Sequence, residues 1–154
     1  MNVFVIDVDG VMTDGKFTYT VDGKTSKTFG PDDADGLILL RDSLNICFVS
    51  ADKKGFEISK KRINYDMGYE IELVSSQDRS AWIDKRFGLQ KTIYMGDGFY
   101  DFKIFQKVGY SITTIDALEH VKDAADFVTS RKGSERAVAE ACIHINEKFF
   151  RLIL

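Results

Sequence analysis

The sequence predicts an α/β fold: a Rossmann-like, doubly wound and mainly parallel sheet with helices on both faces and a β-hairpin insertion after the first strand. Two observations lead to this prediction. Short apolar runs alternate with helix-forming segments through the whole chain, which is typical of a parallel sheet. Around Val21-Asp22-Gly23, two alternating segments flank a strong turn signal, so we expect a hairpin over about 16–29 that interrupts the strand–helix pattern.

The length and composition indicate a single domain over residues 1–154, large enough to bury a core without metal or disulfide support. The net charge of −3 argues against a nucleic-acid or membrane partner, and no apolar run approaches the length of a transmembrane helix. Cys47 and Cys142 are expected to be reduced core thiols. Because no charged leader precedes the first apolar run, we expect a cytoplasmic protein.

The apolar segments place the strands and helices in order. The first strand is the run from Val3 to Ile6, whose β-branched and aromatic residues are typical of a fully buried strand. Further strands are expected at 46–49, 69–74, 92–95, 110–114 and 127–129. Helices are expected between them: one capped by Asp33 and carrying Leu37, one over 53–62, two around 82–87 and 102–105, one over 117–124, and one from about 134.

Two carboxylates stand immediately after the first strand. Asp7 and Asp9 are two residues apart on an extended chain, so they repel each other unless a cation lies between them or one is protonated. The pair is suited to bind a divalent cation through oxygen ligands, or to act as a nucleophile with an acid/base partner. Both interpretations can hold at once, and together they predict a catalytic site at this end of the sheet.

Further polar residues follow the other strands. Ser50 and Asp97 end two of them, and Arg79 lies just inside the helix after the third strand. In a doubly wound sheet these carboxyl ends converge, so Asp7 and Asp97 can share one hard cation, most naturally Mg²⁺. Asp101 comes one helical turn after Asp97, close enough to orient a metal-bound water or to pair with Arg79.

Plainer interpretations remain open for several of these residues. Ser50 could be a helix cap, and Asp101 could cap or solvate its own helix. Arg79 could lie on the surface of its helix. In that case Lys85 or Lys91 would be the candidate cation of the site.

The motifs resemble those of a known superfamily. Asp7-x-Asp9-Gly-Val-x-Thr13-Asp14-Gly15, then Ser50, a basic residue and Gly96-Asp97-x-x-x-Asp101, resemble the haloacid dehalogenase superfamily of phosphotransferases. Three further features resemble its capless subgroup that contains 3-deoxy-D-manno-octulosonate 8-phosphate phosphatase: the hairpin after Gly15, the pattern Phe29-x-x-x-Asp33-x-x-Gly36, and the segment 124–130.

This resemblance implies a phosphatase reaction. Asp7 would attack phosphorus and form an aspartyl-phosphate, while Asp9 would protonate the leaving group and then activate water. Mg²⁺ would be held by Asp7, the backbone carbonyl of Asp9 and Asp97, with Asp101 supporting the metal site. The implied substrate is a small phosphorylated metabolite, a sugar or a sugar acid.

The resemblance also implies residues that bind the substrate. Ser50 and the backbone near Ala51 would contact phosphoryl oxygens, and Arg79 would stabilise the transition state. Thr13 and Asp33 are further candidate substrate-binding residues. Arg79 replaces a usual lysine, and this chain departs from the family in having acidic residues at two usually basic positions near the mouth of the site, Asp52 and Asp32.

Further interpretations concern the assembly of the protein and the acceptor of the phosphoryl group. Small members of the subgroup form tetramers in which the hairpin helps to close a site, so the hairpin over 17–29 is the expected assembly element of a homo-oligomer. The main alternative function is a catalytically silent oligomerisation or regulatory module, related to the carboxyl domain of some sialic acid cytidylyltransferases. Phosphoryl transfer to another acceptor would require a cap domain that excludes water, and none is visible in these residues.

Overall fold

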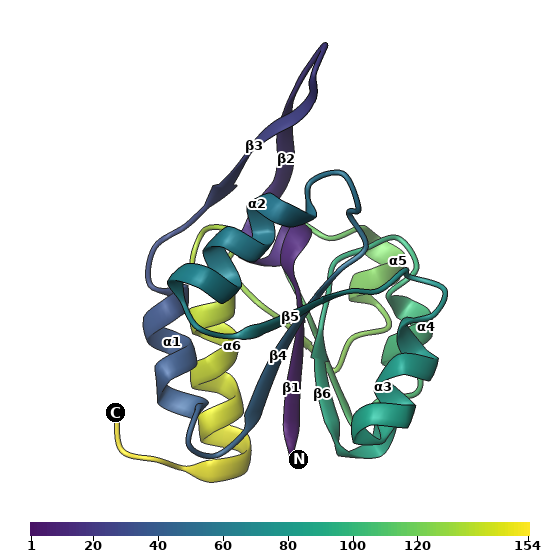
Figure 1. Cartoon of the computed structure of the whole chain (residues 1–154). Helices are drawn as coiled ribbons and strands as arrows, with labels where there is room; N and C mark the ends of the chain where they lie inside the picture. Colours follow the sequence, from purple (N-terminus) through teal and green to yellow (C-terminus); the bar gives the residue numbers. More distant parts are fainter.

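Six parallel strands form the central sheet of the computed structural model, which describes residues 1–154 (Figure 1). Their order is β5-β4-β1-β6-β7-β8, and every neighbouring pair is parallel. The strands are β1 (Val3–Asp7), β4 (Asn45–Ser50), β5 (Glu70–Leu73), β6 (Thr92–Met95), β7 (Tyr110–Thr113) and β8 (Phe127–Val128). This confirms the predicted fold class.

The direction of winding reverses at β1. From β1 the chain passes to β4 and β5 at one edge, then returns to β6 and continues to β7 and β8 at the other edge. The carboxyl end of β1 therefore lies at the topological switch point, between those of β4 and β6. Crevices at such points are where open α/β sheets bind their ligands.

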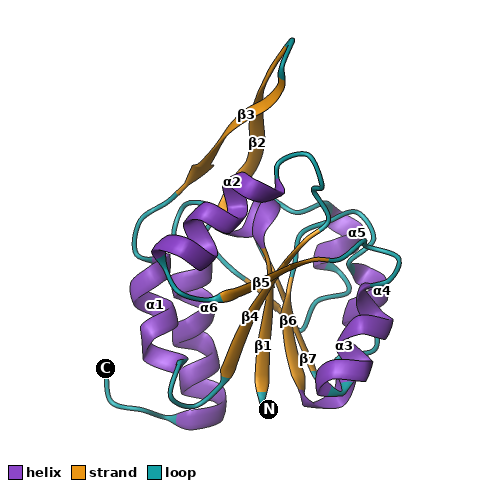
Figure 2. Ribbon diagram, viewed as in Figure 1, coloured by secondary structure: helices purple, strands orange, loops and turns teal.

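Helices cover both faces of the sheet (Figure 2). One face carries α1 (Asp33–Leu40), α2 (Phe56–Lys60) and α6 (Ala137–Ile145), and the other carries α3 (Arg79–Phe87), α4 (Phe102–Phe105) and α5 (Glu119–Lys122). Wider turns extend α2 over Lys61–Asp66 and α6 over Asn146–Phe150, a similar turn follows β1 over Val8–Met12, and a single 3₁₀ turn covers Leu89–Lys91.

The alternation of side chains along β1 divides the core in two. Phe4 and Ile6 pack into the cluster beneath α1 and α6, whereas Val3 and Val5 pack into the cluster beneath α3, α4 and α5. Successive strand residues point to opposite faces, so a strand covered on both sides must be apolar throughout. All five residues of β1 are buried, and this fixes the position of its acidic carboxyl end.

The predicted hairpin is present and projects from the carboxyl end of the sheet (Figure 1). It consists of β2 (Thr13–Thr20) and β3 (Gly23–Phe29), which pair antiparallel as a separate two-stranded sheet. Val21 at the tip is fully exposed. The base of the hairpin lies next to α2 and the loop after β1.

Two local predictions were wrong. The last helix begins at Ala137 and not near residue 134, because Ser134 and Arg136 have φ values of 65° and 73°, which are incompatible with a right-handed helix. Asp33 does not cap its own helix: it is the first residue of α1, and its Oδ1 accepts a hydrogen bond from the backbone N–H of Ala139 in α6, at 2.9 Å.

Both cysteines are buried and unpaired, as predicted. Cys47 lies in β4 and Cys142 in α6. No helix of the structure combines the length and the hydropathy that crossing a membrane requires.

Candidate active site

A polar pocket opens at the carboxyl end of the sheet, where β1, β4 and β6 end below the base of the hairpin. Its lining residues come from the loops after these strands, from the start of α3 and from the hairpin: Asp7, Asp9, Gly15, Phe17, Lys24, Ala51, Asp52, Ser76, Arg79, Asp97 and Gly98. The pocket therefore gathers most of the residues predicted to be catalytic or metal-binding.

The loop after β1 is wound tightly around a glycine. Gly10 has φ +84°, and a Cβ on it would lie only 1.9 Å from Oδ2 of Asp97, so no other residue allows this close approach. Thr13 holds the loop, because its Oγ1 accepts hydrogen bonds from the N–H groups of Gly10 at 3.0 Å and Gly15 at 3.1 Å. Thr13 is fully buried and does not line the pocket, so the structure gives it a role in shaping the loop, and its role in substrate binding stays a prediction.

Arg79 lies at the floor of the pocket and is almost fully buried. Its Nη1 is 3.2 Å from Oδ2 of Asp7, donates to the hydroxyl of Tyr94 at 2.8 Å and lies 3.8 Å from Oδ1 of Asp101, while Nη2 donates to the carbonyl of Val74 at 3.2 Å. Burial would lower the pKa of Arg79, but Asp7, Tyr94 and Asp101 raise it above its usual value. The guanidinium is therefore a permanent positive charge beside Asp7. Both alternative cations, Lys85 and Lys91, are exposed and lie outside the pocket lining.

Asp101 stands behind the pocket and not in its lining. Its Oδ1 accepts a hydrogen bond from the hydroxyl of Tyr94 at 3.0 Å, and its Oδ2 accepts one from the N–H of Gly98 at 2.8 Å. Burial raises the pKa of Asp101, although Arg79 lowers it in part. Of the two roles considered from the sequence, the structure places Asp101 in position to pair with Arg79, and the role of orienting a metal-bound water stays a prediction.

Asp7, Arg79, Tyr94, Asp97 and Asp101 form what we call the Arg79 cluster. It contains three carboxylates and one guanidinium. Burial raises the pKa of Asp7 to about 7; Arg79 lowers it, whereas Asp101 and Asp9 raise it further. Burial, together with Asp7 and Asp101, raises the pKa of Asp97 to about 8. The cluster is therefore short of positive charge, and a divalent cation between Asp7 and Asp97 fits this deficit.

The small number of side-chain ligands at this site indicates which cation it can bind. No group of three or more carboxylate, imidazole or thiol side chains in the structure is spaced to surround a metal ion. An ion held between Asp7 and Asp97 would need further oxygen ligands from the backbone, from water or from a substrate. Mg²⁺ is commonly bound in this way, by one or two carboxylates together with phosphate oxygens.

Asp9 belongs to the opposite side of the pocket. Its Oδ2 accepts a hydrogen bond from the hydroxyl of Ser50 at 2.9 Å, and its Oδ1 is 2.7 Å from Nζ of Lys27. Ser50 is fully buried and its Oγ also accepts from the N–H of Asp52 at 3.1 Å. In this arrangement the Ser50 hydroxyl faces Asp9 and not the pocket, whereas Ala51 does line the pocket.

Asp9, Asp52, Lys24 and Lys27 form a second group, the Lys27 cluster, with two carboxylates and two ammonium groups. Oδ1 of Asp52 is 2.8 Å from Nζ of Lys24, and Oδ2 is 3.0 Å from Nζ of Lys27. Burial would raise the pKa of Asp52, but hydrogen bonds from Lys24, Lys27 and the N–H of Gly55 lower it to about 2. The acidic residue at this usually basic position is thus matched by lysines from the hairpin.

The two remaining sequence-based candidates lie elsewhere. Asp32 pairs with Arg136 on the surface, outside the pocket. Asp33 is buried between α1 and α6, where burial raises its pKa to about 6. Its carboxylate caps α6 through Ala139 and does not line the pocket, so the structure gives Asp33 a structural role, and its role in substrate binding stays a prediction.

Sequence reasoning missed three side chains of the site. Lys24 and Lys27 belong to the hairpin that was expected only to mediate assembly, and they carry the positive charge of the second cluster. Tyr94 supports Arg79 and Asp101 from β6. Its hydroxyl between two apolar residues, three residues before Asp97, is a signal that could have found it.

Comparison with known proteins first defines the class. Residues 80–142 match a family described as haloacid dehalogenase-like hydrolase. The 3-deoxy-D-manno-octulosonate 8-phosphate phosphatase of Haemophilus influenzae is 33% identical over 144 residues, which cover 89% of this chain and 78% of that protein. The chain therefore belongs to the 3-deoxy-D-manno-octulosonate 8-phosphate phosphatase family of haloacid dehalogenase-like hydrolases, and it is a phosphatase. The resemblance found in the sequence is confirmed.

Solved structures agree with this assignment. The cobalt-bound form of the deoxy-D-mannose-octulosonate 8-phosphate phosphatase from Haemophilus influenzae is similar with a TM-score of 0.83 and 28% identity, covering 96% of this chain and 88% of that chain. The phosphatase from Moraxella catarrhalis, in complex with a magnesium ion, a phosphate ion and KDO, is similar with a TM-score of 0.81 and 25% identity, covering 96% and 86%.

Proposed function

We propose that this protein is a Mg²⁺-dependent phosphomonoesterase that acts on a small phosphorylated sugar or sugar acid through an aspartyl-phosphate on Asp7. The observation that carries the proposal is the charge deficit of the Arg79 cluster, where Asp7 and Asp97 face one pocket with raised pKa values. The similar phosphatases named for 3-deoxy-D-manno-octulosonate 8-phosphate, one of them solved with magnesium and phosphate, support the substrate class and the metal.

The metal would be held by the carboxylates of Asp7 and Asp97 and by the backbone carbonyl of Asp9. When bound, it supplies positive charge that offsets the repulsion between the Asp7 carboxylate and an incoming phosphate. Asp101 supports the site indirectly, because it fixes Arg79 through Tyr94. Asp101 is therefore proposed as a positioning residue for the metal site.

The chemistry takes place in two steps on this chain's own residues. In the first, an oxygen of Asp7 attacks phosphorus, the bond from phosphorus to the sugar oxygen breaks, and Asp9 gives its proton to that oxygen. In the second, Asp9 takes a proton from water, the water oxygen attacks phosphorus, and phosphate leaves with Asp7 restored. Arg79 stabilises the negative charge of both transition states while it holds Asp7 in place.

The substrate is expected to enter beside the hairpin. Ala51 lines the pocket, where its backbone would contact phosphoryl oxygens, and the hydroxyl of Ser50 donates to Asp9. Phe17, Lys24 and Asp52 form the outer part of the pocket, where they would contact the sugar. Asp52 and Lys24 form an ion pair in this outer part of the pocket. The carboxylate of Asp52 would accept hydrogen bonds from sugar hydroxyls, and the ammonium group of Lys24 would bind the carboxylate of a sugar acid.

The hairpin tip supports a proposal about assembly. Tyr19 and Val21 are exposed at a distance from the core of their own chain, which is unfavourable for an isolated molecule. We therefore propose a homo-oligomer, with a tetramer favoured, in which this tip contacts a second copy. We also propose that the single domain works in the cytoplasm, where its two thiols would stay reduced.

Hydrolysis assays test the proposed function. An aryl phosphate and a panel of sugar phosphates are incubated with the protein in Mg²⁺, in chelator, and with an Asp7→Asn variant. We expect turnover that requires Mg²⁺ and that the Asn variant lacks, because an amide cannot act as the nucleophile. No turnover of any substrate by folded, Mg²⁺-loaded protein would overturn the proposal and favour a catalytically silent assembly module.

A further inference from the structure

We propose that Lys27 is a positioning residue for Asp9, and that through Lys27 the hairpin forms a working part of the active site of its own chain. This inference rests on the proposed function, because Lys27 has this role only if Asp9 transfers protons at the leaving oxygen. It is separate from the assembly role of the hairpin tip, since every contact that supports it lies within one chain.

The ammonium group of Lys27 is buried among oxygen atoms of three residues. Three oxygen atoms lie around Nζ: Oδ1 of Asp9 at 2.7 Å, Oγ of Ser59 at 2.8 Å and Oδ2 of Asp52 at 3.0 Å. The contact with Ser59 is a hydrogen bond, and the two carboxylates are ion-pair partners. The side chain is only 1% exposed. A lysine so deeply buried is rare unless it is paired, and here one of its partners is a residue of the reaction.

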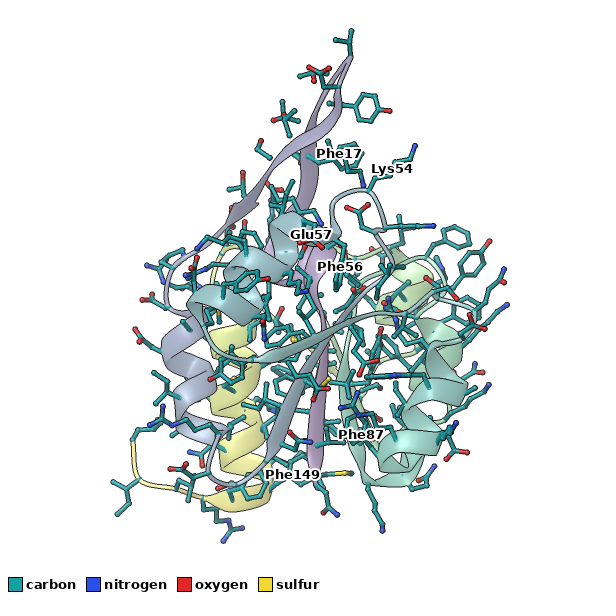
Figure 3. The ribbon with its side chains drawn as sticks, viewed as in Figure 1. Phe17, Lys54, Phe56, Glu57, Phe87 and Phe149 are labelled. Atoms are coloured by element: carbon teal, nitrogen blue, oxygen red, sulfur yellow. The ribbon has the colours of Figure 1, made fainter.

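The surrounding backbone is shaped to admit this lysine. A Cβ on Gly55 would lie 2.8 Å from Cε of Lys27 and 2.3 Å from Oδ2 of Asp52, so the glycine lets the chain before α2 approach the cluster. Ser59 of α2 is fully buried below the hairpin. Figure 3 shows Phe17 of the hairpin above Phe56 of α2, and the strand of the hairpin that contacts α2 is β3.

The contact fixes both oxygens of the Asp9 carboxylate. Ser50 donates to Oδ2 and Lys27 lies against Oδ1, so rotation of the carboxylate would break one contact or the other. Asp9 is nevertheless a third exposed and lines the pocket. A general acid has to be held within hydrogen-bond reach of the oxygen that it protonates. Lys27, from the hairpin, holds one of the two oxygens of the Asp9 carboxylate, and Ser50 holds the other.

Lys24 provides a matched comparison on the same strand. It also pairs with Asp52, at 2.8 Å, but it makes no ion pair with Asp9 and lies over the ring of Phe17, 4.1 Å from the ring centre. Its side chain is 17% exposed, against 1% for Lys27. The two lysines therefore share a partner, a strand and a charge, and they differ in contact with Asp9.

The dependence on the leaving group tests the proposal. An alkyl sugar phosphate needs protonation of its leaving oxygen, whereas the phenolate of an activated aryl phosphate leaves with little help. We expect Lys27→Met to lower kcat/KM for the sugar phosphate at least about tenfold more than for the aryl phosphate, since kcat/KM includes the first chemical step. Lys16→Met, at an exposed lysine of the same hairpin that lies outside the pocket lining, is expected to leave the ratio of the two kcat/KM values unchanged. A general loss of folded protein lowers both kcat/KM values equally.

Two results would overturn the proposal. Equal losses on both substrates in Lys27→Met would show that Lys27 has only a structural role, and so would an equal change of the ratio in the Lys16→Met control. Asp9→Asn sets the reference and is expected to give the largest change of the ratio. If Asp9→Asn does not discriminate between the substrates, the proposed role of Asp9 fails first, and the role of Lys27 fails with it.

A milder variant keeps the test valid if Lys27→Met does not fold. Ser59→Ala removes one of the three oxygens around Nζ and changes no charge. We expect the ratio to shift in the same direction by about two- to threefold, because the ammonium group is less firmly held. An unchanged ratio in a folded Ser59→Ala protein would count against the positioning role.

Discussion

The two clusters that face each other across the pocket differ in charge balance. The Arg79 cluster has three carboxylates and one guanidinium, and the pKa values of Asp7 and Asp97 rise to about 7 and about 8. The Lys27 cluster has two carboxylates and two ammonium groups, and the pKa of Asp52 falls to about 2. The carboxylates of the two clusters are therefore neutralised in different ways. The Arg79 cluster needs a cation from solution, whereas the lysines of the Lys27 cluster balance its carboxylates within the chain.

The difference separates two tasks of the site. The Arg79 cluster stores negative charge that is unfavourable until a divalent ion and a phosphate are bound, as expected of a metal site. The Lys27 cluster is electrically satisfied at all times, as expected of a framework that keeps a proton-transferring group in place. Changes in the first cluster should therefore alter metal dependence, and changes in the second should alter the response to the leaving group.

The largest effect is expected from Asp97→Asn. Loss of a carboxylate ligand should lower kcat/KM about 10³-fold or more, measured with saturating Mg²⁺ on the best sugar phosphate. In chelator the same variant should unfold at a higher temperature than the parent above about pH 7, by about 3 °C or more, because it no longer buries this surplus charge. A lower melting temperature in chelator would contradict the charge deficit.

The sign of the pH effect follows from the raised pKa. The pKa of Asp97 is about 8 in the folded protein and 3.8 in the reference state, so the folded protein holds the proton longer. The stabilising effect of this proton is complete below about pH 4 and is lost as the pH rises through about 8. Metal-free parent protein should therefore lose stability between these values, and Asp97→Asn should lose less.

Arg79→Lys is expected to have the next largest effect. The lysine keeps a positive charge near Asp7, but it cannot contact Asp7, Tyr94 and the carbonyl of Val74 at once. We expect kcat/KM to fall about 10- to 100-fold with Mg²⁺ dependence retained. Arg79→Met should in addition destabilise the protein by about 3–5 kcal/mol in chemical denaturation, because it leaves buried carboxylates without a partner. A fully active Met variant would exclude Arg79 from the reaction.

Asp33→Asn serves as a control for a buried acid outside both clusters. Burial raises the pKa of Asp33 to about 6, and Oδ2 has no hydrogen-bond partner, while Asp32, Arg136 and Cys142 are the neighbouring titratable groups. The parent should lose up to about 3 kcal/mol of stability as the pH rises from about 4 to about 6, and the Asn variant should lose less. Mg²⁺ should raise the melting temperature of the Asp33→Asn variant as much as it raises that of the parent. For Asp97→Asn the rise should be smaller.

The smallest effect on a single chain is expected from Val21→Ser at the hairpin tip. The side chain is fully exposed and far from the Lys27 cluster, so the free energy of unfolding should change by less than about 0.5 kcal/mol. If the tip contacts a second copy, the variant should instead shift the oligomer towards smaller species in light scattering. An unchanged size of the oligomer would show that the hairpin tip does not mediate assembly.

The sequence was sufficient for features that depend on local pattern. The apolar run of β1, the strand ends at Ser50 and Asp97, and the Asp-Gly turn of the hairpin are each coded within a few neighbouring residues. Their convergence follows from the general topology of parallel sheets, so the acidic pocket could be predicted before any coordinates were known. The superfamily followed from the same motifs.

Features that depend on packing between distant elements could not be predicted. Lys27 looks like any exposed hairpin lysine until α2 and the loop after β4 close over it. Asp33 has the sequence signature of a cap, but the N–H group that it binds belongs to Ala139, more than a hundred residues later. Thr13 belongs to the motif through its support of Gly10, which a pattern of residue types does not distinguish from ligand binding.

Calorimetric titration of Mg²⁺ tests the charge deficit of the Arg79 cluster most directly. The protein is titrated near pH 7 in two buffers of different ionisation enthalpy, with Asp97→Asn as the control. Because Asp97 is mostly protonated and Asp7 about half protonated at this pH, binding should release about one to one and a half protons per ion, and affinity should rise between about pH 6 and pH 9. The variant should bind far more weakly. Tight binding that releases no proton, or equal binding by the variant, would contradict the account.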